Sequence, residues 1–262
     1  RQRQMCIRDR LKLDRIDKSL IRTMLGLRKY ICSQFKPNAA KALYDHYHVR
    51  NVLDFSMGWG DRLAGFYASM YTELYVGLDP RKENHPIYEK QANYYANQLG
   101  FFETEKKTKF HCEPAEEFDF DQYKDTFDII FTSPPYFNVE RYSYDDTQSW
   151  VRYKNIDQWN KNFLQSSIEN MWTSLRSGGK LCVNIADVNA GSQGQKKGWL
   201  KICDPMNDFI DTFGDSDYLG CIGMEMASRP NSIGAGTGVE TEESNRKPEM
   251  IKQRSGKFAE PI

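Results

Sequence analysis

The residues best suited to chemistry in this sequence follow a short apolar stretch, Ile129–Phe131. After Thr132 come a serine, two prolines and a tyrosine, namely Ser133, Pro134, Pro135 and Tyr136. Proline has no N–H group and restricts the residue before it, so a strand cannot continue past this point. The corner leaves backbone carbonyl oxygens without a strand partner, beside a hydroxyl group and an aromatic face. Together these groups would form a receptor for a planar amine.

A second stretch, Asp54–Gly60, also follows a short apolar run and contains Gly58 and Gly60. Glycine lacks a Cβ atom, so the backbone can turn sharply and approach a ligand closely. A helical pattern begins at Asp61 and would direct a helix N-terminus at this turn. The dinucleotide fingerprint GxGxxG fails, because position 63 is leucine. A plain strand-to-helix turn is the alternative interpretation.

A third candidate, Asp79, ends the apolar segment Leu74–Leu78. An acid about twenty residues beyond a glycine turn, at a strand end, is placed to bind ribose hydroxyls. Its alternative role is to cap the helix that follows.

These stretches must be brought together by the elements between them. Short apolar runs, typical of buried strands, alternate with segments whose apolar residues recur every three or four positions, as in helices. The alternation predicts an α/β fold with a mainly parallel sheet and helices on both faces. Ligands then bind at the carboxyl ends of the strands. The predicted strands are 51–55, 74–78, 109–112, 127–132, 180–185 and 218–226, and the predicted helices are 20–30, 39–47, 61–70, 88–99, 156–175 (stopped by Gly178 and Gly179) and 206–213.

Composition excludes several classes of protein. The chain has 262 residues, 39% of them hydrophobic, which is enough to build a sizeable core. No apolar run approaches the roughly 18 residues that a membrane helix needs. The six cysteines are scattered without a CxxC pair, and the four histidines show no metal-ligand spacing. We therefore expect no metal site, no disulfide framework and a reducing setting.

Charge is balanced overall, with 36 basic and 36 acidic side chains, but it is unevenly distributed. Residues 1–36 carry eleven Lys or Arg against three Asp or Glu, whereas residues 113–128 carry seven acids and one lysine. A neutral total can hide a basic face and an acidic one. Solvated helix surfaces are the alternative explanation.

Asp54–Gly60, Asp79 and Phe131–Tyr136 resemble the motif set of class I S-adenosylmethionine-dependent methyltransferases that modify exocyclic amino groups of DNA bases. The resemblance spans roughly residues 35–226, and Thr-Ser-Pro-Pro-Tyr is its most specific part. It implies a Rossmann-like fold with a mainly parallel, seven-stranded sheet. It also implies S-adenosylmethionine as cofactor, and a motif order similar to the γ-type arrangement.

The resemblance implies a role for each motif in binding the cofactor. The glycine turn would hold its methionine part, the acid after the second strand its ribose, and the acid after the third strand its adenine amine. Ser56 stands where the family has an aromatic residue, so cofactor packing is expected to differ, with Trp59 as the compensating ring. The implied cofactor residues are Phe35, Pro37, Asp54, Ser56, Gly58, Trp59, Gly60, Asp79, Glu113 and Ser133.

The resemblance also implies the chemistry. A target base is extruded from duplex DNA, because its amine is unreachable inside the stack. Tyr136 stacks on the base, Ser133 and the Pro134 carbonyl accept hydrogen bonds from the amine, and its nitrogen attacks the methyl group. The implied catalytic residues are Ser133, Pro134, Pro135 and Tyr136, and the implied substrate-binding residues are Tyr136, Phe137, Arg141 and Tyr142.

The identity of the substrate stays open. In this family, serine before the prolines goes more with cytosine N4, and aspartate or asparagine with adenine N6, so cytosine N4 is favoured. The sequence has no stretch long enough for a large recognition domain. Recognition of the DNA would therefore depend on residues 137–154, the N-terminal helices and residues 229–257. The aromatic and basic residues of 141–154 suit stacking on bases, or simply loop packing. Alternatives are an RNA-base or protein-glutamine methyltransferase, or a non-catalytic nucleic-acid-binding relic.

The same reasoning suggests an organisation and a setting. Residues 1–10 lack any helical or strand period, and we interpret them as a non-native leader. Residues 11–50 form an N-terminal helical segment, and residues 51–262 form the catalytic domain, whose last strand begins at Phe258 and reads as truncated. We expect a cytoplasmic enzyme of a prokaryotic or phage-infected cell, typical of restriction-modification, with duplex DNA as partner and no membrane.

Overall fold

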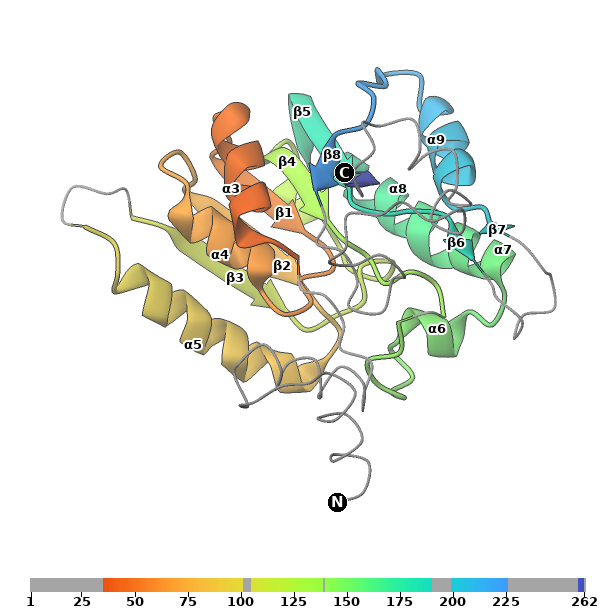
Figure 1. Ribbon diagram of the computed structural model, residues 1–262, viewed down its shortest axis with the longest axis horizontal. Coiled ribbons are helices and arrows are strands. Elements are labelled where there is room, and N and C mark those ends of the chain that lie inside the picture. The colour runs from red at the N-terminus through yellow and green to blue at the C-terminus, as the bar shows by residue number, and fades with distance from the viewer. Residues whose placement is uncertain (1–34, 101–104, 139, 190–198, 226–258, 262) are drawn as a thin grey trace, which may run out of the picture. The chain divides into compact units, whose positions relative to one another are not determined.

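A five-stranded parallel sheet forms the centre of the protein in the computed structural model, which describes residues 35–100, 105–138, 140–189, 199–225 and 259–261 (Figure 1). Its strand order is β3-β2-β1-β4-β5. Sequential strands spread outward from β1 on one side, and the order reverses between β1 and β4. The strands are β1 (Asn51–Asp54), β2 (Leu74–Leu78), β3 (Lys107–His111), β4 (Phe127–Thr132) and β5 (Leu175–Val183). The parallel α/β fold expected from the sequence is confirmed.

Burial explains why the inner strands are nearly all apolar. All six residues of β4 are buried, as expected for a central parallel strand covered on both faces. Successive side chains alternate between the two faces, so Val52 and Leu53 belong to different core clusters.

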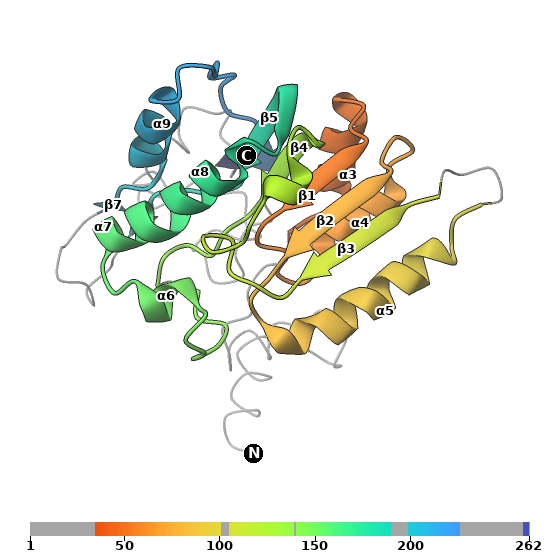
Figure 2. The same cartoon turned by 180° about the vertical axis from the view of Figure 1, so that it is seen from behind.

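Helices cover both faces of this sheet (Figures 1 and 2). On one face, Tyr44, Phe66 and Tyr88 from three helices pack around Val52 and Phe131. Those helices are α3 (Pro37–His46), α4 (Asp61–Ala68) and α5 (His85–Ala96). The opposite side is covered by α7 (Ile156–Trp159), the π-helical turn η3 (Asn160–Gln165), α8 (Ser166–Trp172) and α9 (Cys203–Asp211). Three short helices lie in connecting loops, namely η1 (Lys82–Asn84), η2 (Asp121–Tyr123) and α6 (Ser149–Arg152).

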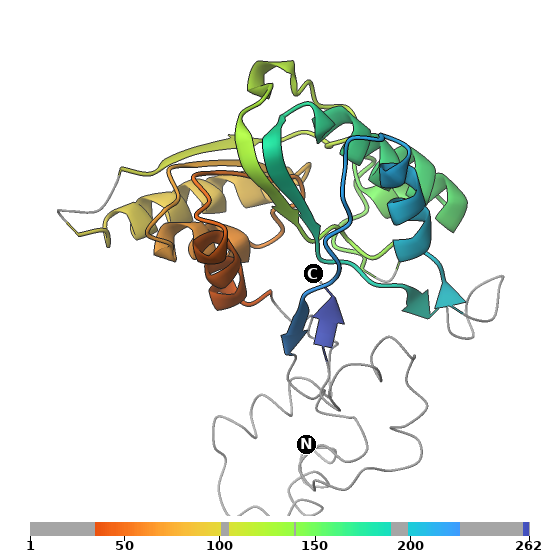
Figure 3. The same ribbon diagram turned by 90° about the horizontal axis from the view of Figure 1, so that it is seen from above.

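The expected number of strands was wrong for the part of the chain that is described, where the main sheet has five strands rather than seven. The predicted strand 218–226 shortens to β8 (Gly223–Glu225), which pairs antiparallel with β9 (Ala259–Pro261) in a separate ladder (Figure 3). Tyr218, Leu219 and Ile222 are exposed, so this segment offers no buried face to the main sheet. A further two-stranded ladder joins β6 (Val188–Asn189) and β7 (Trp199–Leu200).

The region 156–185 also differs from its prediction. Instead of one helix that Gly178 and Gly179 stop, the helical turns end at Trp172, and β5 begins at Leu175. The glycines lie inside the strand, where the register against β4 shifts between Phe127 and Ile129. Gly178 has a φ of 75°, a conformation that a bulge favours and that residues with a Cβ rarely adopt. Glycine here accommodates an irregular strand.

Two expectations concern membranes and metals. No described helix is long and apolar enough to cross a bilayer. The described residues also contain no group of three or more side chains that could hold a metal ion. The predicted helix 20–30, the leader 1–10 and the loop 229–257 lie outside the described residues.

The packing of α3 on α4 generates a stability prediction at Gly65. A Cβ atom there would lie 2.6 Å from Ala40 Cβ and 2.7 Å from the Pro37 carbonyl oxygen. Gly65→Ala should therefore destabilise the fold by about 1–3 kcal/mol through overpacking. In an open helix the same change would stabilise by roughly 1 kcal/mol. Chemical denaturation measures the change, with exposed Ala68→Ser as control; a stabilised Gly65→Ala variant would contradict this packing.

Candidate active site at the carboxyl edge of the sheet

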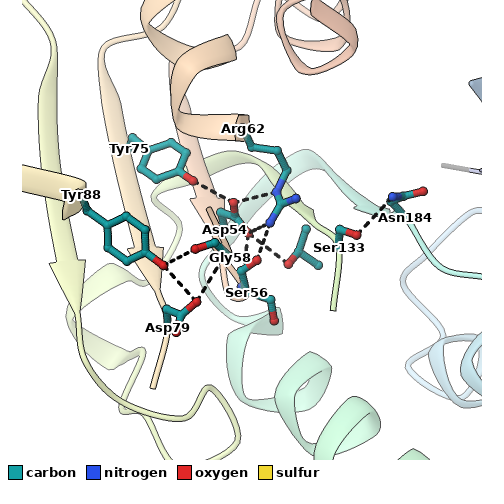
Figure 4. A network of polar contacts seen from close by, with 10 residues as sticks. Asp54, Ser56, Gly58, Arg62, Tyr75, Asp79, Tyr88, Ser133 and Asn184 are labelled. Carbon is teal, nitrogen blue, oxygen red and sulfur yellow. Dashed lines mark hydrogen bonds and ion pairs between the residues drawn. The ribbon is translucent and has the colours of Figure 1, made fainter. Parts of the chain in front are cut away.

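Four of the parallel strands end side by side, and a polar residue of interest ends or directly follows each of them. Asp54 ends β1, Asp79 follows β2, Ser133 follows β4 and Asn184 follows β5. The registers pair Asp54 with Gly77, and Thr132 with Val183, so these ends are aligned. Figure 4 shows the resulting network. Ligands of open α/β sheets bind at this edge, where the strand order reverses.

The glycine turn after β1 is held from both sides. Gly58 and Gly60 have φ values of 59° and 81°, which explains why glycines occupy these positions. The Met57 N–H donates to the Leu78 carbonyl at 3.0 Å, which ties the turn to the end of β2. A Cβ atom on Gly58 would meet nothing closer than 3.9 Å, so the backbone is open to a ligand there.

Asp54 and Arg62 form a buried ion pair beneath this turn. Arg62 Nε donates to Asp54 Oδ2 at 2.7 Å, and Arg62 Nη2 donates to Asp54 Oδ1 at 3.1 Å. Asp54 is fully buried and Arg62 is 3% exposed. Burial alone would lower the pKa of the guanidinium, but the charge of Asp54 outweighs it and raises that pKa. The guanidinium of Arg62 therefore stays charged although it is buried.

The remaining acceptor capacity of Asp54 is also used within the protein. It accepts hydrogen bonds from Tyr75 Oη at 2.7 Å, Thr132 Oγ1 at 3.1 Å and the Ser56 N–H at 3.2 Å. Arg62 in turn donates to the Ser56 carbonyl. Asp54 therefore links β1, β2, β4 and α4, and it positions the turn rather than presenting a free carboxylate.

Asp79 is a carboxylate that contacts the turn and keeps acceptor capacity. It accepts from the Gly58 N–H at 3.1 Å, the Arg81 N–H at 2.9 Å and Tyr88 Oη at 3.0 Å. Tyr88 Oη also lies 2.5 Å from the Gly58 carbonyl oxygen, and its single proton can serve only one of these two acceptors at a time. Burial raises the pKa of Asp79 above that of an ordinary aspartate.

The Ser133–Tyr136 corner lies directly beyond β4. Thr132, which precedes it, bonds to Asp54, so the corner and the glycine turn share one anchor. Tyr136 is half-buried, its N–H donates to Glu140 Oε2 at 3.2 Å, and its hydroxyl donates to the Asn184 carbonyl at 3.5 Å. Burial raises the pKa of Glu140.

Phe137 closes the corner with a φ of 47°, a strained value for an aromatic residue. Its ring is 5% exposed and packs 6.2 Å from that of Trp159. The structure therefore places this predicted substrate residue in the core, where it supports the corner.

Asn184 was missed by the sequence analysis. It is 3% exposed, its N–H donates to the Thr132 carbonyl at 2.8 Å, and its Nδ2 donates to Ser133 Oγ at 3.1 Å. The signal that could have identified Asn184 is a polar residue at the end of a predicted strand, which is the signal that identified Asp79.

Other predicted residues lie around this centre. Phe35 contacts Phe131 edge-on at 5.5 Å and lies over the Arg62 guanidinium, whereas Pro37 is exposed at the start of α3. Trp59 on the glycine turn and Tyr142 beyond the proline corner meet edge-on at 5.9 Å. Glu113, two residues after β3, is exposed.

Most aromatic and basic residues of 141–154 pack on one another. Arg141 and Lys154 lie 5.1 Å and 5.7 Å from the Trp150 ring, and Arg152 pairs with Glu116 and Glu117. Tyr144 is 82% exposed. Loop packing therefore accounts for much of this segment.

Comparison with known proteins gives matches among solved structures alone. No protein-family model and no curated protein matches the sequence. The YcgJ protein from Bacillus subtilis matches with 15% identity and a TM-score of 0.35, over 56% of this chain and half of that one. The N-methyltransferase NodS from Bradyrhizobium japonicum matches with 12% identity and a TM-score of 0.40, over 65% and 80%. The N-terminal domain of EvdMO1, with SAH bound, matches with 20% identity and a TM-score of 0.30, over 39% of each chain.

The buried ion pair generates the prediction for this site. Arg62→Met should destabilise the protein by about 3–5 kcal/mol, because it leaves the Asp54 charge buried and unpaired. Arg50→Met is the matched control, since Arg50 is exposed and its contact with Glu73 is 3.6 Å long. The control should cost about 1 kcal/mol or less. Urea denaturation compares the two, and equal losses would show that Asp54 does not depend on Arg62.

Proposed function

We propose that the protein is an S-adenosylmethionine-dependent methyltransferase that acts on an exocyclic amino group of a DNA base, with cytosine N4 favoured over adenine N6. One observation carries this proposal most: Asp54 binds both the glycine turn and Thr132, the residue before the Ser-Pro-Pro-Tyr corner. A cofactor on the turn and an amine at the corner would therefore be held next to each other. Positioning of this kind is a large part of transfer catalysis.

The residues at the turn fit the proposed cofactor. A ribose diol needs two acceptor positions, and Asp79 can supply them when Tyr88 donates to the Gly58 carbonyl instead. The open backbone at Gly58 leaves room for a ligand there. Trp59, 40% exposed, offers an aromatic ring on the turn, whereas Ser56 offers none. When bound, S-adenosylmethionine supplies an electrophilic methyl group.

The chain's own residues would orient the amine. Among the described residues, no backbone N–H donates to the Pro134 carbonyl, and Ser133 precedes it in the chain. Tyr136, fixed at its N–H by Glu140 and at its hydroxyl by Asn184, would stack on the base. A base must leave the duplex to reach such a corner. The described residues offer no cluster of metal ligands, and this chemistry needs none.

Methyl transfer tests the proposal directly. Purified protein is incubated with labelled S-adenosylmethionine and unmethylated duplex DNA, and the nucleosides are then identified by mass. We expect N4-methylcytosine. Tyr136→Ala should lower the rate about 10–100-fold, because base stacking on an aromatic side chain is worth roughly 1–3 kcal/mol. Tyr94→Ala, which removes an exposed ring from α5, is the control and should leave the rate unchanged.

Each other outcome points elsewhere. N6-methyladenine would change the target base and keep the reaction. Label on RNA or on a glutamine peptide, with none on DNA, would overturn the DNA assignment. Failure to bind S-adenosylmethionine would favour a non-catalytic relic.

Asp79 generates a pH prediction for cofactor binding. Its raised pKa means that it takes up a proton at a higher pH than an ordinary aspartate, whose pKa is about 3.9. The protonated acid loses acceptor capacity. Affinity for S-adenosylmethionine should therefore fall as the pH is lowered through the raised pKa of Asp79, and it should stay constant at higher pH. Asp79→Asn should bind about 10–100-fold more weakly and respond little to pH.

Titration calorimetry from about pH 4, close to the ordinary pKa of aspartate, up to about pH 8 measures this dependence. Asp121→Asn, at an exposed carboxylate on η2, should bind as the wild type does. A wild-type profile that matches that of Asp79→Asn would contradict the assignment of Asp79 to the ribose.

A further inference from the structure

We infer that Asn184 is a positioning residue that turns the Ser133 hydroxyl into a hydrogen-bond donor for the ring nitrogen next to the target amine. This inference rests on the proposed function and deepens it. It assigns recognition of the base to two polar groups: the Pro134 carbonyl accepts from the amine, and the Ser133 hydroxyl donates to the ring nitrogen.

Asn184 contacts the end of β4 and the proline corner at three points. Its N–H donates to the Thr132 carbonyl at 2.8 Å, and its Nδ2 donates to Ser133 Oγ at 3.1 Å. Its carbonyl accepts from Tyr136 Oη at 3.5 Å. Figure 4 shows the amide of Asn184 directed at Ser133 from the strand next to the one that Ser133 follows. The residue therefore fixes where the serine hydroxyl lies relative to the tyrosine ring.

The direction of the hydrogen bond sets what the hydroxyl can still do. A serine hydroxyl has one proton and two acceptor positions. Because the amide NH₂ group can only donate, the bond from Asn184 uses one acceptor position and leaves the Ser133 proton available. Accepting a hydrogen bond also polarises the O–H group and strengthens it as a donor. Ser133 is thus prepared to donate.

The bases in question present the matching pattern. In cytosine the N4 amine lies next to the unprotonated ring nitrogen N3, and in adenine the N6 amine lies next to N1. The Pro134 carbonyl, which can only accept, suits the amine. Ser133, prepared as a donor, suits the ring nitrogen. This pairing holds the base in one orientation, with the amine at a fixed place.

The amide is not explained by fold stability alone. Asn184 Oδ1 is buried and has no hydrogen-bond partner among the described residues. A buried acceptor without a partner costs free energy that an apolar side chain of similar size would avoid. The side chain contributes one bond, the donation to Ser133, and its position beside the corner gives that bond a functional use.

Substrate analogues that lack the ring nitrogen test the inference. The probes are duplex oligonucleotides in which the target base is 3-deazacytosine or 1-deazaadenine; each keeps the amine and replaces the ring nitrogen by C–H. Wild-type protein should transfer methyl groups to the analogue about tenfold more slowly than to the normal base, since one hydrogen bond is lost. Ser133→Ala should be slowed on the normal base and should lose nothing further on the analogue.

Asn184→Asp tests the positioning itself. A carboxylate has no N–H group and would accept the Ser133 proton, turning it away from the substrate. We expect kcat on the normal base to fall about tenfold, sensitivity to the ring nitrogen to disappear, and S-adenosylmethionine affinity to stay at the wild-type value. Asn160→Asp is the matched control, because Asn160 is a buried amide that bonds to the Lys201 carbonyl away from the site. It should keep the full sensitivity.

The outcomes separate this inference from the proposed function. The rate loss caused by Asn184→Asp and the rate loss caused by the analogue could act independently, so that the variant is slowed by the analogue as much as the wild type is. This result would overturn the positioning role and leave the methyltransferase proposal intact. If Asn184→Asp fails to fold, Ser133→Ala still tests the inference. A Ser133→Ala protein that is slowed by the analogue as much as the wild type is would overturn it. Wild-type protein that binds S-adenosylmethionine and methylates no duplex would overturn both proposals.

Discussion

The Asp54–Arg62 ion pair lies at the point where β1 ends, and the candidate site is arranged around it. Removing two charges from water costs several kcal/mol per ion, so such a pair persists only when other hydrogen bonds satisfy it. Asp54 meets that condition through Tyr75, Thr132 and the Ser56 N–H. The partners come from different strands and from the turn. One carboxylate therefore sets the separation between the glycine turn and the proline corner.

Around this anchor, the groups proposed to meet ligands differ in how far the protein constrains them. Asp79 shares the Tyr88 proton with the Gly58 carbonyl, so it can exchange a protein contact for a ligand contact. The corner is instead held rigid by Phe137, whose strained backbone is stabilised by burial of its ring against Trp159. An adaptable carboxylate beside a rigid corner suits a site that must bind and release a cofactor while it holds a second reactant in one orientation.

Much of this arrangement could be predicted from the sequence, because it depends on local patterns. Asp54, Asp79 and Ser133 each follow an apolar run, and parallel strands bring their carboxyl ends to one edge. The inward orientation of Asp54 could not be predicted, since it depends on Tyr75 and Thr132, far away in the chain. The burial of the Phe137 ring could not be predicted either, since it depends on packing against Trp159. Gly178 and Gly179 resembled a helix stop, and their place inside a strand follows from pairing with β4.

A crystal structure of the chain with S-adenosylhomocysteine tests the central claim most directly. We predict that the ribose hydroxyls bind Asp79, that the sulfur lies beside the Ser133–Tyr136 corner, and that Asp54 remains paired with Arg62. A ligand bound away from Asp79, or Asp54 released from Arg62 to contact the ligand, would contradict this prediction.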